Sequence, residues 1–185
     1  MMRMHRERSQ LLVIDMQERL LPHIHQSETV VTNCLRAMRL AKRLDVPIMI
    51  SEQNPKGIGP TVEVVRDEAG NTATIFEKMH FSCMQDEAIY QHLVRMRDGE
   101  RFQIVLVGVE AHVCVAQTAL HLAAAGYNTF VMADAVSSRT AQSRELALNR
   151  MRQAGVIITD IESVAFEWLE KAGTQEFRDL LPMLK

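Results

Sequence analysis

Short apolar runs alternate with longer stretches of helical periodicity along the chain. The runs at 11–14 and 104–107 are apolar at every position, which is typical of strands that are buried on both faces. Runs of this kind predict six strands, at 10–14, 47–51, 74–77, 103–107, 128–132 and 156–159. Apolar residues spaced three and four apart predict helices at 27–44, 61–67, 85–97, 113–125, 141–154, 161–171 and 175–184.

The alternation of strands and helices predicts an α/β fold. Right-handed βαβ crossovers would build a mostly parallel sheet with helices on both faces. We expect one domain over residues 9–185, after a short solvated arm at 1–8, and a surface loop at 53–60 near the site. If the strand order is 3-2-1-4-5-6, the first and fourth strands are neighbours at the switch point, where ligands bind beyond the carboxyl ends of the strands.

Composition narrows the class of protein. The net charge of −2 offers no basic surplus for nucleic acid or anionic membrane, so we expect neither partner. No apolar stretch approaches the length of a membrane span, and the basic start lacks the apolar core of a secretory signal. Three cysteines without framework spacing favour a reducing compartment, the cytoplasm or, from the basic start, the mitochondrion.

The sequence gives no support for a cofactor or a catalytic metal. It contains neither a G-x-G-x-x-G fingerprint nor a Walker lysine motif, so a nucleotide cofactor is not expected. His23 and His25 come nearest to a pair of metal ligands, and polar residues at a helix start or in a loop explain them better.

Cys114 is the candidate nucleophile, because it lies between the predicted fourth strand and the helix that follows. A thiol in a first helical turn feels the positive end of the helix dipole, which favours the reactive thiolate. The alternative is a buried cysteine that acts as a small hydrophobe, and helical spacing predicts that role for Cys34. Cys83 follows Ser82 at a helix start that resembles a capping box, which favours a structural role.

Two charged residues end other predicted strands. Asp15 closes the first strand and Lys78 closes the third. Asp15 could take the proton of the Cys114 thiol, and Lys78 could keep Asp15 charged and lower the pKa of the thiol. The alternatives are a helix cap for Asp15 and a solvated surface position for Lys78.

The ordered set of motifs resembles the isochorismatase-like cysteine hydrolases, which include nicotinamidases, N-carbamoylsarcosine amidohydrolases and isochorismatases. The likeness covers roughly residues 9–169. The matching segments are Leu-Val-Ile-Asp-Met-Gln at 12–17, Lys78 with Phe81-Ser82, Gly-Val-Glu-Ala-His-Val-Cys at 108–114 and Asp-Ala-Val-Ser-Ser-Arg at 134–139.

The resemblance implies a three-layer α/β/α sandwich and a catalytic triad of Asp15, Lys78 and Cys114. It also implies a cis peptide between Val109 and Glu110. The backbone N–H groups of Glu110 and Cys114 would then form an oxyanion hole. Residues near the substrate would be Gln17, Glu52 and Phe81.

The chain departs from the nicotinamidase pattern after the second strand. The segment Ser-Glu-Gln-Asn at 51–54 lacks the metal-binding Asp-x-His arrangement, which argues against metal-dependent nicotinamidase activity. After the fifth strand, Asp134, Ser137 and Ser138 are expected to cap the next helix.

We therefore expect a hydrolase that cleaves a small amide or carbamoyl C–N bond through a covalent thioester. The alternatives are a non-catalytic interaction protein on the same scaffold and an RNA-linked, nuclease-type activity. The resemblance implies a homo-oligomer, a dimer or tetramer. Apolar positions that look exposed, Val164, Phe166 and Trp168, favour the same conclusion, and the alternative is that these residues fill the core.

Overall fold

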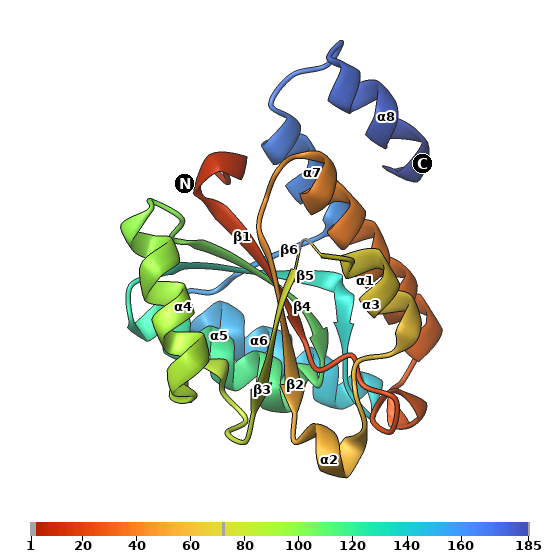
Figure 1. The fold of residues 1–185 in the computed structure, drawn as a ribbon, viewed down its shortest axis with the longest axis vertical. Helices are drawn as coiled ribbons and strands as arrows, with labels where there is room; N and C mark the ends of the chain where they lie inside the picture. The colour runs from red at the N-terminus through yellow and green to blue at the C-terminus, as the bar shows by residue number, and fades with distance from the viewer. Residues whose placement is uncertain (1–2, 72, 185) are drawn as a thin grey trace.

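The computed structural model describes residues 3–71 and 73–184, and over these residues the strands form one parallel sheet of six (Figure 1). The order is β3-β2-β1-β4-β5-β6, which confirms the predicted topology. The strands are β1 (Ser9–Ile14), β2 (Ile48–Gln53), β3 (Ala73–Lys78), β4 (Gln103–Val109), β5 (Asn128–Ser137) and β6 (Ile157–Thr159).

Helices cover both faces of the sheet, so the predicted three-layer α/β/α sandwich is confirmed (Figure 1). One core lies under the helices α1 (Ser27–Arg43), α3 (Glu63–Ala69), α7 (Ile161–Leu169) and α8 (Gln175–Leu184). The other core lies under the helices α4 (Glu87–Asp98), α5 (Ala116–Ala124) and α6 (Ala141–Gln153). The expected loop at 53–60 instead contains a short helix, α2 (Pro55–Ile58).

Strand β1 shows why the central runs are apolar at every position. Leu11 and Val13 pack into the core under α1, whereas Leu12 and Ile14 pack into the core under α5. Successive side chains of a strand point to opposite faces, so a strand between two helical layers needs apolar residues throughout.

Gly108 brings β4 close to the end of β1. Its φ of 109° lies in the region that favours glycine. A Cβ at this position would lie 2.1 Å from the carbonyl oxygen of Ile14, the residue before Asp15. The glycine therefore allows the backbone that leads to Cys114 to approach the backbone that carries Asp15.

Strand β5 is five residues longer than the sequence predicts, because Val136 and Ser137 continue the pairing with β4. The expected capping of α6 by Asp134, Ser137 or Ser138 is therefore wrong. Thr140 caps that helix, accepting a hydrogen bond from the Ser143 N–H at 3.0 Å.

The carboxylate of Asp134 belongs to another helix start. It accepts from the Ile161 N–H, in the first turn of α7, at 3.2 Å. Asp134 thus accepts a hydrogen bond at a helix N-terminus, as its residue type suggests, but at that of α7 instead of α6.

The described part of the N-terminal arm is packed on the domain at Met4, whereas Arg3, Glu7 and Arg8 are exposed; residues 1 and 2 lie outside the described residues. Met4 is buried, and its backbone N–H donates to the Glu167 carboxylate at 2.6 Å. Val164 and Trp168, expected at the surface, are buried in the core beneath α7, and Phe166 is exposed. Helix α7 turns its apolar face inward, because α7 must cover its share of the sheet.

Candidate active site

Asp15 and Lys78 meet as a buried ion pair at the carboxyl ends of the strands. The Lys78 Nζ lies 2.8 Å from Asp15 Oδ2, and both side chains are completely buried. Strand β2 lies between β1 and β3, so the long lysine side chain reaches across it to Asp15. The alternative of a solvated surface lysine is wrong.

The hydrogen-bond capacity of the Lys78 ammonium is fully used. Its acceptors are Asp15 Oδ2, Gln53 Oε1 at 2.7 Å and the Phe81 carbonyl oxygen at 3.3 Å. An ammonium has three N–H donors, so three acceptors occupy all of them. Lys78 is therefore placed to act on Asp15 rather than on a bound molecule.

Cys114 lies in a π-helical turn, Ala111–Val115, that leads into α5. Its side chain is buried, and the residue is 5% exposed. The thiol lies close enough to the carboxyl group of Asp15 for each group to shift the pKa of the other. The structure thus brings together the three residues that the sequence singles out, and their catalytic role stays a prediction.

The expectation that Cys114 rests as a thiolate is not supported by its surroundings. Burial raises the pKa of the Cys114 thiol, and the negative charge of Asp15 raises it further. The positive charge of Lys78 opposes both effects without outweighing them. These surroundings favour the neutral thiol over the thiolate, so a reaction at the sulfur would need a group that accepts the thiol proton.

The same burial makes Asp15 a better proton acceptor. Loss of solvation raises the pKa of the carboxyl group above its ordinary range, although Lys78, Ser51 and Cys114 each lower it. For Lys78, burial lowers the pKa of the ammonium, but the charge and hydrogen bond of Asp15, together with the nearby thiols of Cys83 and Cys114, outweigh burial and raise it. The two groups therefore stabilise each other's charged forms against the cost of burial.

The turn before Cys114 contains a cis peptide between Val109 and Glu110, at the bond that the family resemblance implies. Glu110 is buried, and its carboxylate accepts from Arg139 Nε at 2.8 Å. Its carbonyl oxygen accepts from the N–H groups of Val113 and Val115, which closes the turn around the thiol.

Gln17 and Glu52 lie near Asp15, Lys78 and Cys114, but their polar side-chain atoms are hydrogen-bonded to backbone groups. Gln17 Nε2 donates to the Gln53 carbonyl at 3.0 Å and to the Gly59 carbonyl at 2.6 Å. Glu52 accepts from the Thr61 N–H at 2.7 Å. These two residues hold the 53–61 segment in place. The ring of Phe81 is exposed, and its carbonyl is the group that contacts Lys78.

Sequence reasoning missed Ser51 and Gln53. Ser51 Oγ donates to Asp15 Oδ1 at 2.7 Å, and Gln53 accepts from Lys78. Both are polar residues at the end of an otherwise apolar strand that neighbours β1, which is the signal that could have found them.

Cys83 is a second buried thiol near the pair. Its backbone N–H donates to Thr118 Oγ1 at 3.0 Å. Burial raises the pKa of the Cys83 thiol to about 11, and the charge of Asp15 acts in the same direction. Cys34, in contrast, is buried in α1 against Met16, as its helical spacing predicts.

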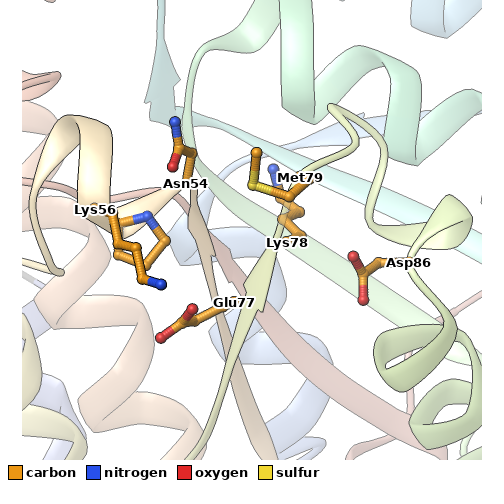
Figure 2. Close-up of a pocket in the computed structure, with 7 residues that line it drawn as sticks. Asn54, Lys56, Glu77, Lys78, Met79 and Asp86 are labelled. Atoms are coloured by element: carbon orange, nitrogen blue, oxygen red, sulfur yellow. The ribbon is translucent and has the colours of Figure 1, made fainter.

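A pocket of about 180 Å³ adjoins the cluster at the ends of β2 and β3 (Figure 2). Figure 2 shows Lys56 and Glu77 turned toward each other, with Asp86 on the far side. Of the described residues, those that line it do not include Asp15 or Cys114; they are Asn54, Pro55, Lys56, Glu77, Lys78, Met79 and Asp86.

The described ranges, 3–71 and 73–184, contain no group of three or more His, Cys, Asp or Glu side chains arranged to hold a metal ion. None of their helices is long and apolar enough to cross a membrane.

Comparison with known proteins gives consistent matches over nearly the whole chain. The model of the isochorismatase domain family matches residues 9–163. Isochorismatase domain-containing protein 2 of Danio rerio is 38% identical over 176 residues, which are 95% of this chain and 86% of the relative.

Solved structures match as well. The structure of MAR1 ribonuclease from Caenorhabditis elegans has a TM-score of 0.91 and 32% identity, covering 98% of this chain and 92% of that one. The YcaC gene product of Escherichia coli, described as an octameric hydrolase of unknown specificity, has a TM-score of 0.89 and 23% identity, covering 100% and 89%.

Proposed function

Because the chain belongs to the isochorismatase domain family, we propose that it is a cysteine hydrolase that cleaves a small C–N bond, in an amide or a carbamoyl group. The observation that carries the proposal is the buried Asp15 carboxylate, which accepts from the Lys78 ammonium at 2.8 Å and lies within electrostatic reach of the Cys114 thiol. A thiol beside a base that is itself held by a third group is the arrangement of an activated nucleophile.

In the proposed first half-reaction, Cys114 attacks the substrate carbonyl carbon. The thiol gives its proton to Asp15 as the sulfur–carbon bond forms, and the carbonyl electron pair moves onto oxygen. The N–H groups of Glu110 and Cys114 are proposed to stabilise that oxyanion. Collapse of the intermediate breaks the C–N bond, and the leaving amine takes the proton from Asp15.

The second half-reaction releases the product. Water gives a proton to Asp15 and adds to the thioester carbonyl. The C–S bond then breaks, and the sulfur of Cys114 takes the proton back from Asp15. A neutral thiol and a charged Asp15 are thereby restored. The raised pKa of the Asp15 carboxyl group suits this role, because the group must accept a proton twice in each cycle.

Lys78 has a supporting role in this proposal. Its three N–H donors are already engaged, so it stabilises the charged form of Asp15 without touching the substrate. Gln17 and Glu52 support the segment beside the pocket, and the exposed ring of Phe81 is free to border the entrance. No step requires a metal or an organic cofactor.

The decisive experiment is a turnover screen over amides, carbamoyl compounds and thioesters. Wild type should hydrolyse at least one of them, and Cys114→Ala should not. A matched control, Cys34→Ala, removes another buried thiol and should keep the activity. Mass spectrometry of a quenched reaction should find an acyl or carbamoyl group on Cys114. Turnover that survives Cys114→Ala would refute the proposal.

RNA cleavage is a second candidate, because the similar Caenorhabditis elegans structure is described as a ribonuclease. The small exposure of Cys114 and the net charge of −2 favour a small substrate over a polyanion. Single- and double-stranded RNA therefore belong in the same screen. If wild type cleaves RNA and Cys114→Ala does not, the proposed site acts on RNA. If neither wild type nor the variant acts on any compound, the interaction-protein alternative gains support.

We also propose that residues 9–185 act as one domain and assemble as a homo-oligomer. The similar Escherichia coli protein is described as octameric. Exposed apolar side chains near the site, Met79 and Phe81, are candidates for burial by a second copy. Three free, buried cysteines fit a reducing compartment, the cytoplasm or the mitochondrion. Sedimentation velocity that shows only a 21.0 kDa monomer would refute the assembly.

A further inference from the structure

Ser51 and Gln53 occupy alternate positions at the end of β2, between the strands that carry Asp15 and Lys78. Residues two apart on a strand point to the same face of the sheet. Ser51 contacts one member of the buried pair, and Gln53 contacts the other. The middle strand therefore supplies one neutral polar group to each partner of an ion pair that spans it.

We infer that Ser51 and Gln53 are positioning residues that set the proton affinity of Asp15. The inference rests on the proposed function, in which Asp15 is the base. Both residues lie in the segment 51–54, which lacks the metal-binding Asp-x-His arrangement.

Ser51 acts on Asp15 directly. Its hydroxyl donates to Oδ1 at 2.7 Å, whereas Lys78 donates to Oδ2 at 2.8 Å, so each carboxylate oxygen has its own donor. A hydrogen bond to the charged form of a carboxyl group lowers its pKa. Ser51 thereby offsets part of the rise that burial causes and favours the charged form of Asp15.

Gln53 acts through Lys78. Its Oε1 accepts from Nζ at 2.7 Å, and its Nε2 donates to the Met79 carbonyl at 2.8 Å. The second bond fixes which end of the amide faces the ammonium, since a reversed amide would set N–H groups against N–H groups. Gln53 thus holds the cation against Asp15 without adding a negative charge.

Neutral groups at these positions are chemically appropriate. A carboxylate at position 53 would compete with Asp15 for the same ammonium and would raise the pKa of Asp15 by repulsion. A hydroxyl and an amide satisfy the buried partners and leave Asp15 as the acceptor for the Cys114 proton.

The test measures the alkylation of Cys114 by iodoacetamide, so it does not depend on knowing the substrate. The sulfur–carbon bond forms, iodide leaves, and the thiol proton passes to Asp15. In wild type, the rate measured by peptide mass spectrometry should show an inflection at low pH that Asp15→Asn removes. Ser51→Ala should move that inflection upward by about one pH unit, the size of one charge-assisted hydrogen bond.

Two further variants make the result specific. Ser51→Thr keeps the hydroxyl and should restore the wild-type inflection. Gln53→Glu should move it upward, because its new carboxylate repels the charged form of Asp15. Ser9→Ala, which removes a buried hydroxyl at the opposite end of β1, should leave it unchanged.

The outcomes separate the two claims. If Asp15→Asn removes the inflection but Ser51→Ala and Gln53→Glu do not move it, the positioning role is wrong and the proposed function stands. If the inflection survives in Asp15→Asn, Asp15 is not the base and both claims fall. A shift in Ser9→Ala as large as that in Ser51→Ala would assign the effect to general loosening of the fold and overturn the inference.

Discussion

The two ends of strand β1 are both buried and polar, but their polar groups differ in kind. At the amino end, the Ser9 hydroxyl donates to the His5 carbonyl at 2.8 Å and accepts from Trp168 Nε1 at 2.9 Å. These groups are neutral. At the carboxyl end, Asp15 is ionised and paired with the Lys78 ammonium.

The comparison shows two roles for buried polar groups. The neutral groups at the amino end stabilise the packing, and the ion pair at the carboxyl end supplies a proton acceptor. The neutral network joins the N-terminal segment, β1 and α7, and its satisfied hydrogen bonds stabilise the packing. The ion pair loses solvation at both charges, a loss that can equal or exceed the attraction between them, so stability alone does not explain it. Because burial raises the pKa of Asp15, the pair provides a proton acceptor beside a thiol.

The largest expected effect is on turnover by Asp15→Asn. The amide keeps the size of the side chain but cannot accept the thiol proton, so the turnover number should fall by about 10²–10⁴-fold. The measurement is steady-state kinetics on any substrate that the screen finds. A loss of less than tenfold would contradict the role of Asp15 as the acceptor of the thiol proton.

Breaking the ion pair from the other side should reduce stability. Lys78→Met leaves a buried carboxylate without its cation, and the free energy of unfolding should fall by about 3–5 kcal/mol. Urea denaturation measures the change. The double variant Asp15→Asn with Lys78→Met removes both charges and should recover much of the loss. Equal stability of the single and double variants would show that the unpaired carboxylate of Asp15 is not the cause of the loss.

The pH dependence of the free energy of unfolding tests the burial of the Cys83 thiol, which lies at the same end of the sheet as Asp15. The folded-state pKa of Cys83 is raised from 9.0 to about 11, so the folded chain holds its proton more tightly than the unfolded chain. The resulting stability is complete below pH 9.0 and is lost as the pH rises through about 11. This contribution amounts to about 3 kcal/mol.

The matched variant for that measurement is Cys83→Ala. Its free energy of unfolding should fall less steeply over the same alkaline interval than that of the wild type, whatever its stability at neutral pH. Parallel curves for the two proteins would show that the Cys83 thiol does not resist ionisation in the folded state.

The smallest effect is expected at the amino end. Ser9→Ala leaves the buried Trp168 indole N–H without its acceptor, and the free energy of unfolding should fall by about 1–3 kcal/mol. Turnover should stay at the wild-type level, because Ser9 lies at the far end of β1 from Asp15. Loss of turnover at constant stability would show that the two ends of the strand are coupled.

Much of the fold was predictable because local pattern and sheet burial agree. The runs in β1 and β4 are apolar at every position, and only a strand between two helical layers requires that. Where β5 continues through Ala133 and Asp134, composition gives no such signal. Its last residues are held by pairing with β4, a contact that no local pattern specifies.

The candidate site was predictable for its end-of-strand residues and not for their partners. Asp15, Lys78 and Cys114 each follow a strong strand signal. Parallel strands end at one edge of the sheet, so their convergence follows from strand order. Ser51 and Gln53 become meaningful only when β2 is known to lie between β1 and β3.

The sequence by itself determined the α/β alternation and the identity of the thiol, the carboxylate and the lysine. These follow from periodicity and from chemistry that each residue carries alone. The tertiary structure decided the raised pKa of the Cys114 thiol, the completed hydrogen bonding of Lys78 and the inward face of α7. Those properties depend on burial and on neighbours distant in the chain, because a pKa or an exposed surface belongs to an environment rather than to a residue.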